Sequence, residues 1–152
     1  MRALKLVQHM KQNADGMSEG LLRRIRESDK CRELSRLVQA DEHKRYASGI
    51  YRDLTNWLSA ETSSVIEQHF VTLGERRAQQ RVPFSDVFWA ACIARDYLWD
   101  YMQQECLIEE PVEFWGGVNL LYSLNKFFDR VLYLTLIGYQ KVGKGELAAL
   151  PA

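Results

Sequence analysis

The stretch EFWGGVNLLYSLNKFFDRVLYLTLIGYQ, residues 113–140, contains no proline and decides the fold class. Its apolar side chains recur at near-heptad spacing, which is typical of a helix whose seam faces another helix. The residues of this seam are Phe114, Val118, Leu121, Leu124, Phe128, Val131 and Thr135. The spacing therefore predicts one long helix from Glu113 to about Gln140.

A second set of apolar side chains covers much of the remaining surface of this helix, namely Leu120, Phe127, Leu132, Leu134, Leu136 and Tyr139. A surface helix needs an apolar arc only somewhat wider than 100°. We therefore expect the helix to pack both on its own core and on a second copy in a homodimer. The alternative is a central helix wrapped within the monomer. The predicted dimer interface is Phe114, Val118, Leu121, Leu124, Phe128 and Val131.

Proline occurs only at positions 83, 111 and 151, where a helix begins or the domain has ended, so the long stretches between are free to be helical. Apolar spacing of three and four predicts helices over about 2–13, 18–27, 41–58, 60–81 and 84–105, and a short segment near 34–38. Ser18 and Asp41 are candidate N-caps. The sequence predicts an all-α bundle of about six to seven helices over residues 1–141. The glycines at 138, 143 and 145 predict a short flexible tail over 142–152.

Composition points to an ordinary folded domain, since 47% of the 152 residues are apolar and 26% are charged. Residues 1–83 hold 15 Lys/Arg against 11 Asp/Glu, and residues 84–152 hold 5 against 9. This mild split is far from the clustered basic surface of a nucleic-acid-binding protein. We therefore expect no nucleic-acid partner.

The three cysteines, Cys31, Cys92 and Cys106, are widely spaced and suggest neither a disulfide framework nor a zinc site. The first residues lack the apolar stretch of a signal peptide, and no apolar run approaches the roughly 20 residues that span a bilayer. The sequence predicts a cytoplasmic protein without membrane insertion.

Catalytic signatures are missing, since the sequence has no Glu-x-x-His pair, no Gly-rich phosphate loop and no G-x-S-x-G motif. We therefore expect no enzymatic activity and no bound metal. His69 is the one histidine on a clearly apolar helix face, where it is either a hydrogen-bonded histidine or a haem ligand. Arg95 interrupts another apolar stripe and is expected to pair with Asp96, Asp100 or Asp129.

Three stretches in order, YRDLTNWL (51–58), LGERRAQQRVPFSDV (73–87) and FFDRVLYLTLIGY (127–139), carry a family resemblance. They resemble the N-terminal sensory domain of RsbR-type stressosome proteins and of related histidine kinases, over about residues 1–141. The resemblance implies a globin-like fold with long C-terminal helices that form a dimer, mostly without haem. It implies signal reception, with the C-terminal helix acting on an output domain or a downstream signalling protein. The stretch after Tyr139 is too short for a STAS or kinase domain, so covalent coupling to an effector is not assumed.

The haem alternative can be examined through residue spacing. In a globin the proximal histidine lies about seven residues before the proline that precedes the next-to-last long helix. Counting back from Pro83 reaches Arg76, whose guanidinium stays protonated and cannot ligate iron. His69 lies two turns earlier on nearly the same face, so ligation from there requires a shifted pocket.

The favoured function is a haem-free, globin-like sensor or regulatory domain of bacterial signal transduction that acts as a dimer and binds a small apolar ligand. The residues expected to line the ligand pocket are Trp57, Phe70, Phe88, Trp89 and Trp99, although aromatic side chains at this spacing also occur as plain core. One alternative is a haem-binding, globin-type sensor that uses His69. A further alternative is a stand-alone protein-interaction scaffold.

Overall fold

Helices make up nearly all of the computed structural model, which describes residues 3–58, 63–105 and 111–150 and, within them, the side chains of 5–58, 64–105 and 121–150. These parts contain no strand, so the predicted all-α class is confirmed. The elements are α1 (Ala3–Gln12), α2 (Ala14–Glu27), η1 (Asp29–Cys31), α3 (Arg32–Leu37), α4 (Ala40–Leu58), α5 (Ser63–Gln79), α6 (Phe84–Gln104) and α7 (Pro111–Ala149).

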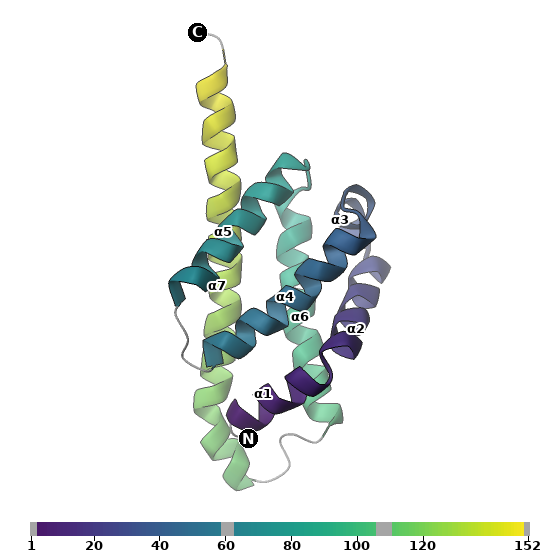
Figure 1. Ribbon diagram of the computed structural model, residues 1–152, viewed down its shortest axis with the longest axis vertical. Helices are drawn as coiled ribbons and strands as arrows, with labels where there is room; N and C mark the ends of the chain where they lie inside the picture. Colours follow the sequence, from purple (N-terminus) through teal and green to yellow (C-terminus); the bar gives the residue numbers. More distant parts are fainter. Residues whose placement is uncertain (1–2, 59–62, 106–110, 151–152) are drawn as a thin grey trace.

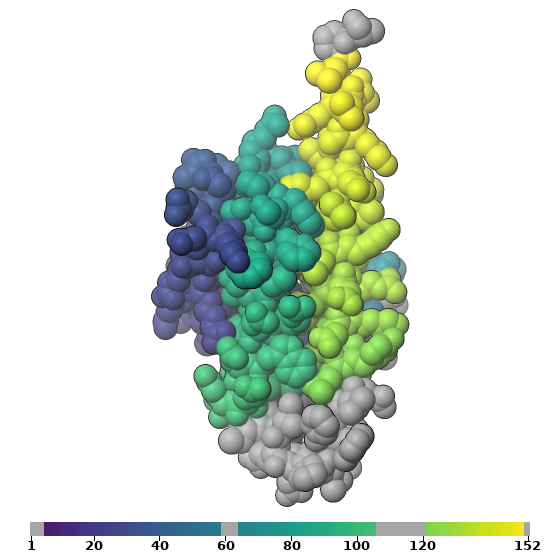
Figure 2. Space-filling model, turned by 180° about the vertical axis from the view of Figure 1, so that it is seen from behind, coloured from purple at the N-terminus to yellow at the C-terminus, as the bar shows by residue number. Residues whose placement is uncertain are grey.

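Helix α7 forms the long axis of the molecule (Figure 1). Its 39 residues correspond to about 58 Å at 1.5 Å per residue. Helix α5 crosses it obliquely, α6 runs beside it on the rear face (Figure 2), and α2 and α3 lie on the side of the bundle away from it. The C-terminal part of α7 projects beyond all the other helices.

The crossing of α5 and α7 is a contact between backbones, and it is the largest interhelical contact of the fold. A Cβ atom on Gly74 would lie 2.2 Å from the carbonyl oxygen of Thr135, and one on Gly138 would lie 2.2 Å from the carbonyl oxygen of Val71. Any side chain at either position would force the helices apart, because the atoms in the way belong to the backbone. The two glycines therefore set the position of α5 on α7.

The inner face of α7 is buried in the monomer's own core. Leu124, Phe128 and Val131 are all 3% exposed or less, and Leu121 is half-buried against the same core. The prediction that these residues form a dimer interface is wrong for the three buried side chains, because α4, α5 and α6 pack on α7 and cover the seam. The side chains of Phe114 and Val118 lie outside the described part of the chain.

Several predicted helix ends also differ from the structure; Asp41, predicted as an N-cap, lies within the first turn of α4. Helix α7 continues to Ala149 instead of ending near Gln140, so most of the predicted flexible tail is helical. Each internal glycine costs only about 1 kcal/mol relative to alanine, and the lysine, glutamate, leucine and alanine around Gly143 and Gly145 favour a helix. Helix α2 begins at Ala14, four residues before the predicted cap, and the Ser18 hydroxyl donates to the Ala14 carbonyl at 2.8 Å within the helix.

Candidate functional site

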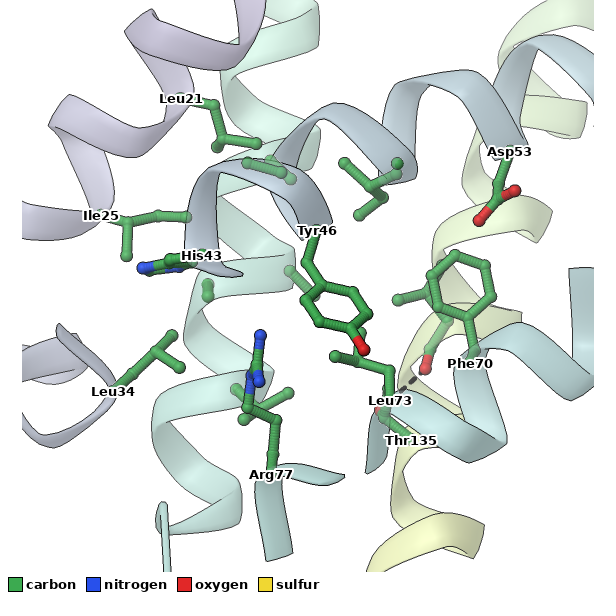
Figure 3. A pocket seen from close by; sticks show the side chains of 18 of the residues that line it. Leu21, Ile25, Leu34, His43, Tyr46, Asp53, Phe70, Leu73, Arg77 and Thr135 are labelled. Carbon is green, nitrogen blue, oxygen red and sulfur yellow. Dashed lines mark hydrogen bonds between the residues drawn. The ribbon is translucent and has the colours of Figure 1, made fainter. Parts of the chain in front are cut away.

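A cavity of about 90 Å³ lies where α4 and α5 pack over α6 and α7 (Figure 3). Its positions on α4 and α5 recur every three or four residues, which places them on one face of each helix. Its wall is mainly aliphatic and aromatic: Leu21, Ile25, Leu34, Ala47, Ile50, Phe70, Leu73, Val87, Ala90, Ala91, Ala94 and Val131. The polar side chains in the wall are His43, Tyr46, Asp53, His69, Arg77 and Thr135. They gather at two ends of an otherwise apolar space.

Arg77 forms the first polar end, which Figure 3 shows between His43 and Tyr46. Its side chain is only 3% exposed, and burial lowers the pKa of its guanidinium. Nη1 donates to Gln80 Oε1 at 2.8 Å and lies 3.4 Å from Glu42 Oε1. The guanidinium carbon lies 4.6 Å from the centroid of the Tyr46 ring, which is cation–π distance. A cation is thus held inside the protein at the edge of the cavity.

Glu42 is the acidic partner of Arg77, and it is shared with Arg76. It accepts hydrogen bonds from Arg76 Nε and Gln80 Nε2, each at 2.9 Å. Burial opposes ionisation of Glu42, but these hydrogen bonds and the charges of Arg76 and Arg77 lower its pKa. One carboxylate therefore faces two guanidinium groups, and the local charge is positive.

His43 lies beside Arg77 and is 6% exposed. Burial, reinforced by the charges of Arg77 and Arg26, lowers the pKa of His43 to about 4. Its imidazole is therefore neutral near pH 7, with one nitrogen as donor and the other as acceptor. Neither nitrogen is hydrogen-bonded to another residue of the described chain.

Asp53 and His69 form the second polar end. The Nδ1 atom of His69 lies 2.9 Å from Asp53 Oδ2, and the imidazole is half-exposed while the carboxylate is buried. Burial raises the pKa of Asp53 against the opposing effect of His69. Asp53 follows His43 by ten residues on α4, so the two ends are separated by about 15 Å along that helix.

Most of the predicted pocket residues lie elsewhere. Phe70 lines the cavity, whereas Trp57, Phe88, Trp89 and Trp99 do not. The Trp57 indole donates to Ser123 Oγ at 3.2 Å, and Trp99 packs half-buried against the core. Phe88 and Trp89 are 41% and 37% exposed and line a separate, more open pocket on the surface of α6.

The sequence-based search missed Arg77, His43 and Glu42. A signal for Arg77 was present, since it continues the Phe70, Leu73 spacing on the apolar face of α5. His69 was expected on an apolar face, and the structure places it half-exposed at the margin of the cavity. Arg95 pairs with Asp96 at 3.8 Å, one of the three partners that were considered.

The cavity beside His69 is small for a haem group. Pockets for ligands of that size are typically several hundred Å³, and this cavity is about 90 Å³. His69, the residue predicted as the iron ligand in the haem alternative, is half-exposed, and its Nδ1 lies 2.9 Å from Asp53 Oδ2, a contact that leaves Nε2 able to act as a ligand. No group of three or more His, Cys, Asp or Glu in the described parts of the chain could hold a metal ion.

Comparisons of the chain with models of known protein families, with curated proteins and with solved structures find no match. Within the residues that the structure describes, none of the helices has the length and apolar character needed to cross a bilayer.

Proposed function

We propose that this protein is a haem-free, globin-like sensor or regulatory domain of bacterial signal transduction, which binds a small, largely apolar ligand in the cavity and acts through a homodimer. The observation that carries the proposal is the composition of the cavity wall. Val131 and Thr135 of α7 line the same space as Phe70, Leu73 and Arg77 of α5. A ligand there touches both helices of the largest contact in the fold.

A change in helix packing is the means by which such a ligand can act. The Gly74–Gly138 crossing lies next to the cavity, one residue from Leu73 and three from Thr135. A ligand shifts the packing only as far as its affinities for two arrangements differ. Because the backbones of the two helices are in direct contact, even a small displacement of α5 requires a displacement of α7.

The proposed dimer interface is the outer face of α7. This face exposes large apolar side chains at successive intervals of eleven and three residues: Tyr122, Tyr133, Leu136 and Leu147, followed by Leu150 directly after the helix. Such intervals keep the residues within one arc of a helix. Exposed large apolar side chains on one arc of a helix support an interaction site there, although the exposed polar residues Asn125, Lys126, Asp129, Gln140 and Lys144 lie between them. Part of this set lies on the projecting end of α7, where a second copy can pair with it without touching the bundle (Figure 1).

The family resemblance supports the same role. Two of its three stretches, 73–87 and 127–139, contain the crossing glycines and the cavity residues Arg77, Val131 and Thr135. In the RsbR-type sensory domains that the chain resembles, dimers form through the C-terminal helices. The proposal therefore assigns the output to α7.

Sedimentation velocity tests the dimer. We expect the wild-type chain to sediment as a dimer and the Leu136→Asp variant as a folded monomer, because the charge would be desolvated in the interface. Val65→Asp is the matched control, since Val65 is 68% exposed on α5, away from the outer face of α7. A wild-type monomer at every concentration, or a monomeric Val65→Asp variant, would contradict the proposed interface.

A further inference from the structure

We infer that the Arg77 end of the cavity binds the carboxylate of a small monocarboxylic acid, whose apolar part lies against Phe70, Leu73 and Val131. The inference rests on the proposed function, because it specifies the ligand of the same cavity. Three properties of the cavity support it: open donors, an excess of positive charge, and a small volume.

The open donors belong to Arg77. A guanidinium has five N–H groups, and only Nη1 has hydrogen-bond partners among the described residues, at Gln80 and Glu42. Nε and Nη2 have no hydrogen-bond partner among the described residues and are not fully enclosed by protein atoms, so a ligand in the cavity that Arg77 lines can supply their acceptors. A carboxylate is the acceptor whose two oxygens match a guanidinium best.

The charge at this end also favours an anion. Within the described chain, Glu42 is the carboxylate paired with Arg77, and it is paired more closely with Arg76. Arg26 adds to the positive field at His43. A ligand carboxylate would supply the second negative charge. The neutral His43 ring lies beside it with a donor nitrogen that no described residue uses.

The volume limits the apolar part of the ligand. The cavity is about 90 Å³, which is smaller than the engineered cavity of about 150 Å³ that holds benzene. An acid with a few carbon atoms, such as butyrate, suits this space. A dicarboxylate does not, since its second charge would approach Asp53 or lie against aliphatic side chains.

Calorimetric titration of the full chain with sodium butyrate and with 1-butanol, at matched ionic strength, tests the inference. We expect butyrate to bind at least about tenfold more tightly, the factor typical of a charge-assisted hydrogen bond. Arg77→Gln should remove this preference and leave 1-butanol binding unchanged. Arg76→Gln is the matched control, because Arg76 pairs with the same Glu42 carboxylate but is half-exposed and outside the cavity wall.

The outcomes separate this inference from the proposed function. Equal affinity for butyrate and 1-butanol overturns the carboxylate site and leaves an apolar-ligand sensor. Absence of binding by both probes overturns both. An equal loss of butyrate affinity in the two arginine variants shows a general charge effect and also overturns the site. If the Arg77→Gln variant does not fold, the affinities of the wild-type protein for butyrate and 1-butanol still test the site. A butyrate-induced shift of the Arg77 Nε–H resonance in the NMR spectrum is then the second measurement.

Discussion

The two faces of α7 both carry large apolar side chains, but only the inner face is buried in the monomer. On the inner face Phe127 and Phe128 are 1% and 2% exposed, and Gly138 meets the backbone of α5. On the outer face Tyr133 and Leu136 are 54% and 40% exposed. The inner face is therefore part of the monomer, and only the outer face is available to a partner. Hydrophobicity alone does not distinguish them, because the distinction depends on which other helices pack on α7.

The largest expected effect comes from adding a methyl group to the inner face. Gly138→Ala should lower the free energy of unfolding by about 4 kcal/mol, because its Cβ would meet backbone atoms that move only if the helices separate. Gly145→Ala, in the projecting part where a Cβ meets nothing within 4 Å, should raise it by about 0.5–1 kcal/mol. Urea unfolding of both variants measures the difference. Equal stabilities would contradict the backbone contact.

Side-chain truncation on each face should give the next largest contrast. Leu124→Ala should cost about 3 kcal/mol of unfolding free energy, since Leu124 is 1% exposed and its removal leaves a cavity. Leu136→Ala should cost less than about 1 kcal/mol in dilute monomeric protein. Thermal unfolding followed by circular dichroism measures both. A comparable loss at Leu136 would mean that the outer face belongs to the fold.

The pH dependence of the free energy of unfolding tests whether the fold keeps the His43 imidazole, in the cavity wall, neutral. The pKa of His43 is about 4 in the folded protein, lowered by burial and by Arg77 and Arg26 against a smaller opposing effect of Glu42. The unfolded chain therefore binds a proton first, and stability is lost as pH falls below about 6.5. Between pH 6.5 and 5 the His43 contribution should be about 2 kcal/mol.

The His43→Gln variant isolates that contribution. Both proteins share every carboxylate that titrates in this range, so their difference in urea-unfolding free energy reports His43. We expect the variant to lose less stability than the wild type on going from pH 6.5 to 5. Equal losses would show that His43 is not held neutral by the fold.

Much of the fold could be predicted from the spacing of apolar residues. Prolines at 83 and 111 and the three-four repeats located the long helices, because period and helix breakers are local properties of the chain. The end of α7 lies beyond the predicted one, because the helix-forming residues around Gly143 and Gly145 outweigh the cost of these glycines. The sequence could not show whether the apolar seam of α7 packs within the monomer or against a second copy, because the pattern of one helix does not reveal which other helices cover it.

The candidate site was harder to predict, because it depends on contacts between residues far apart in sequence. Glu42 meets Arg76 and Gln80 only after α4 packs against α5. The aromatic residues that drew attention, such as Trp89, lie on the outer side of α6, where Trp89 instead binds the Lys30 ammonium 3.8 Å from its ring centroid. The sequence signal for this site is an arginine, Arg77, at helical spacing with the apolar residues Phe70 and Leu73.

The claim that the cavity and the outer face of α7 are coupled is tested most directly by the dissociation constant of the dimer. Sedimentation equilibrium should be measured with and without a saturating amount of the tighter of the two probes, butyrate and 1-butanol, at constant ionic strength. We predict a change of at least about fivefold, the lower end of typical coupling between sites. An unchanged constant, with probe binding confirmed by calorimetry, would contradict the coupling.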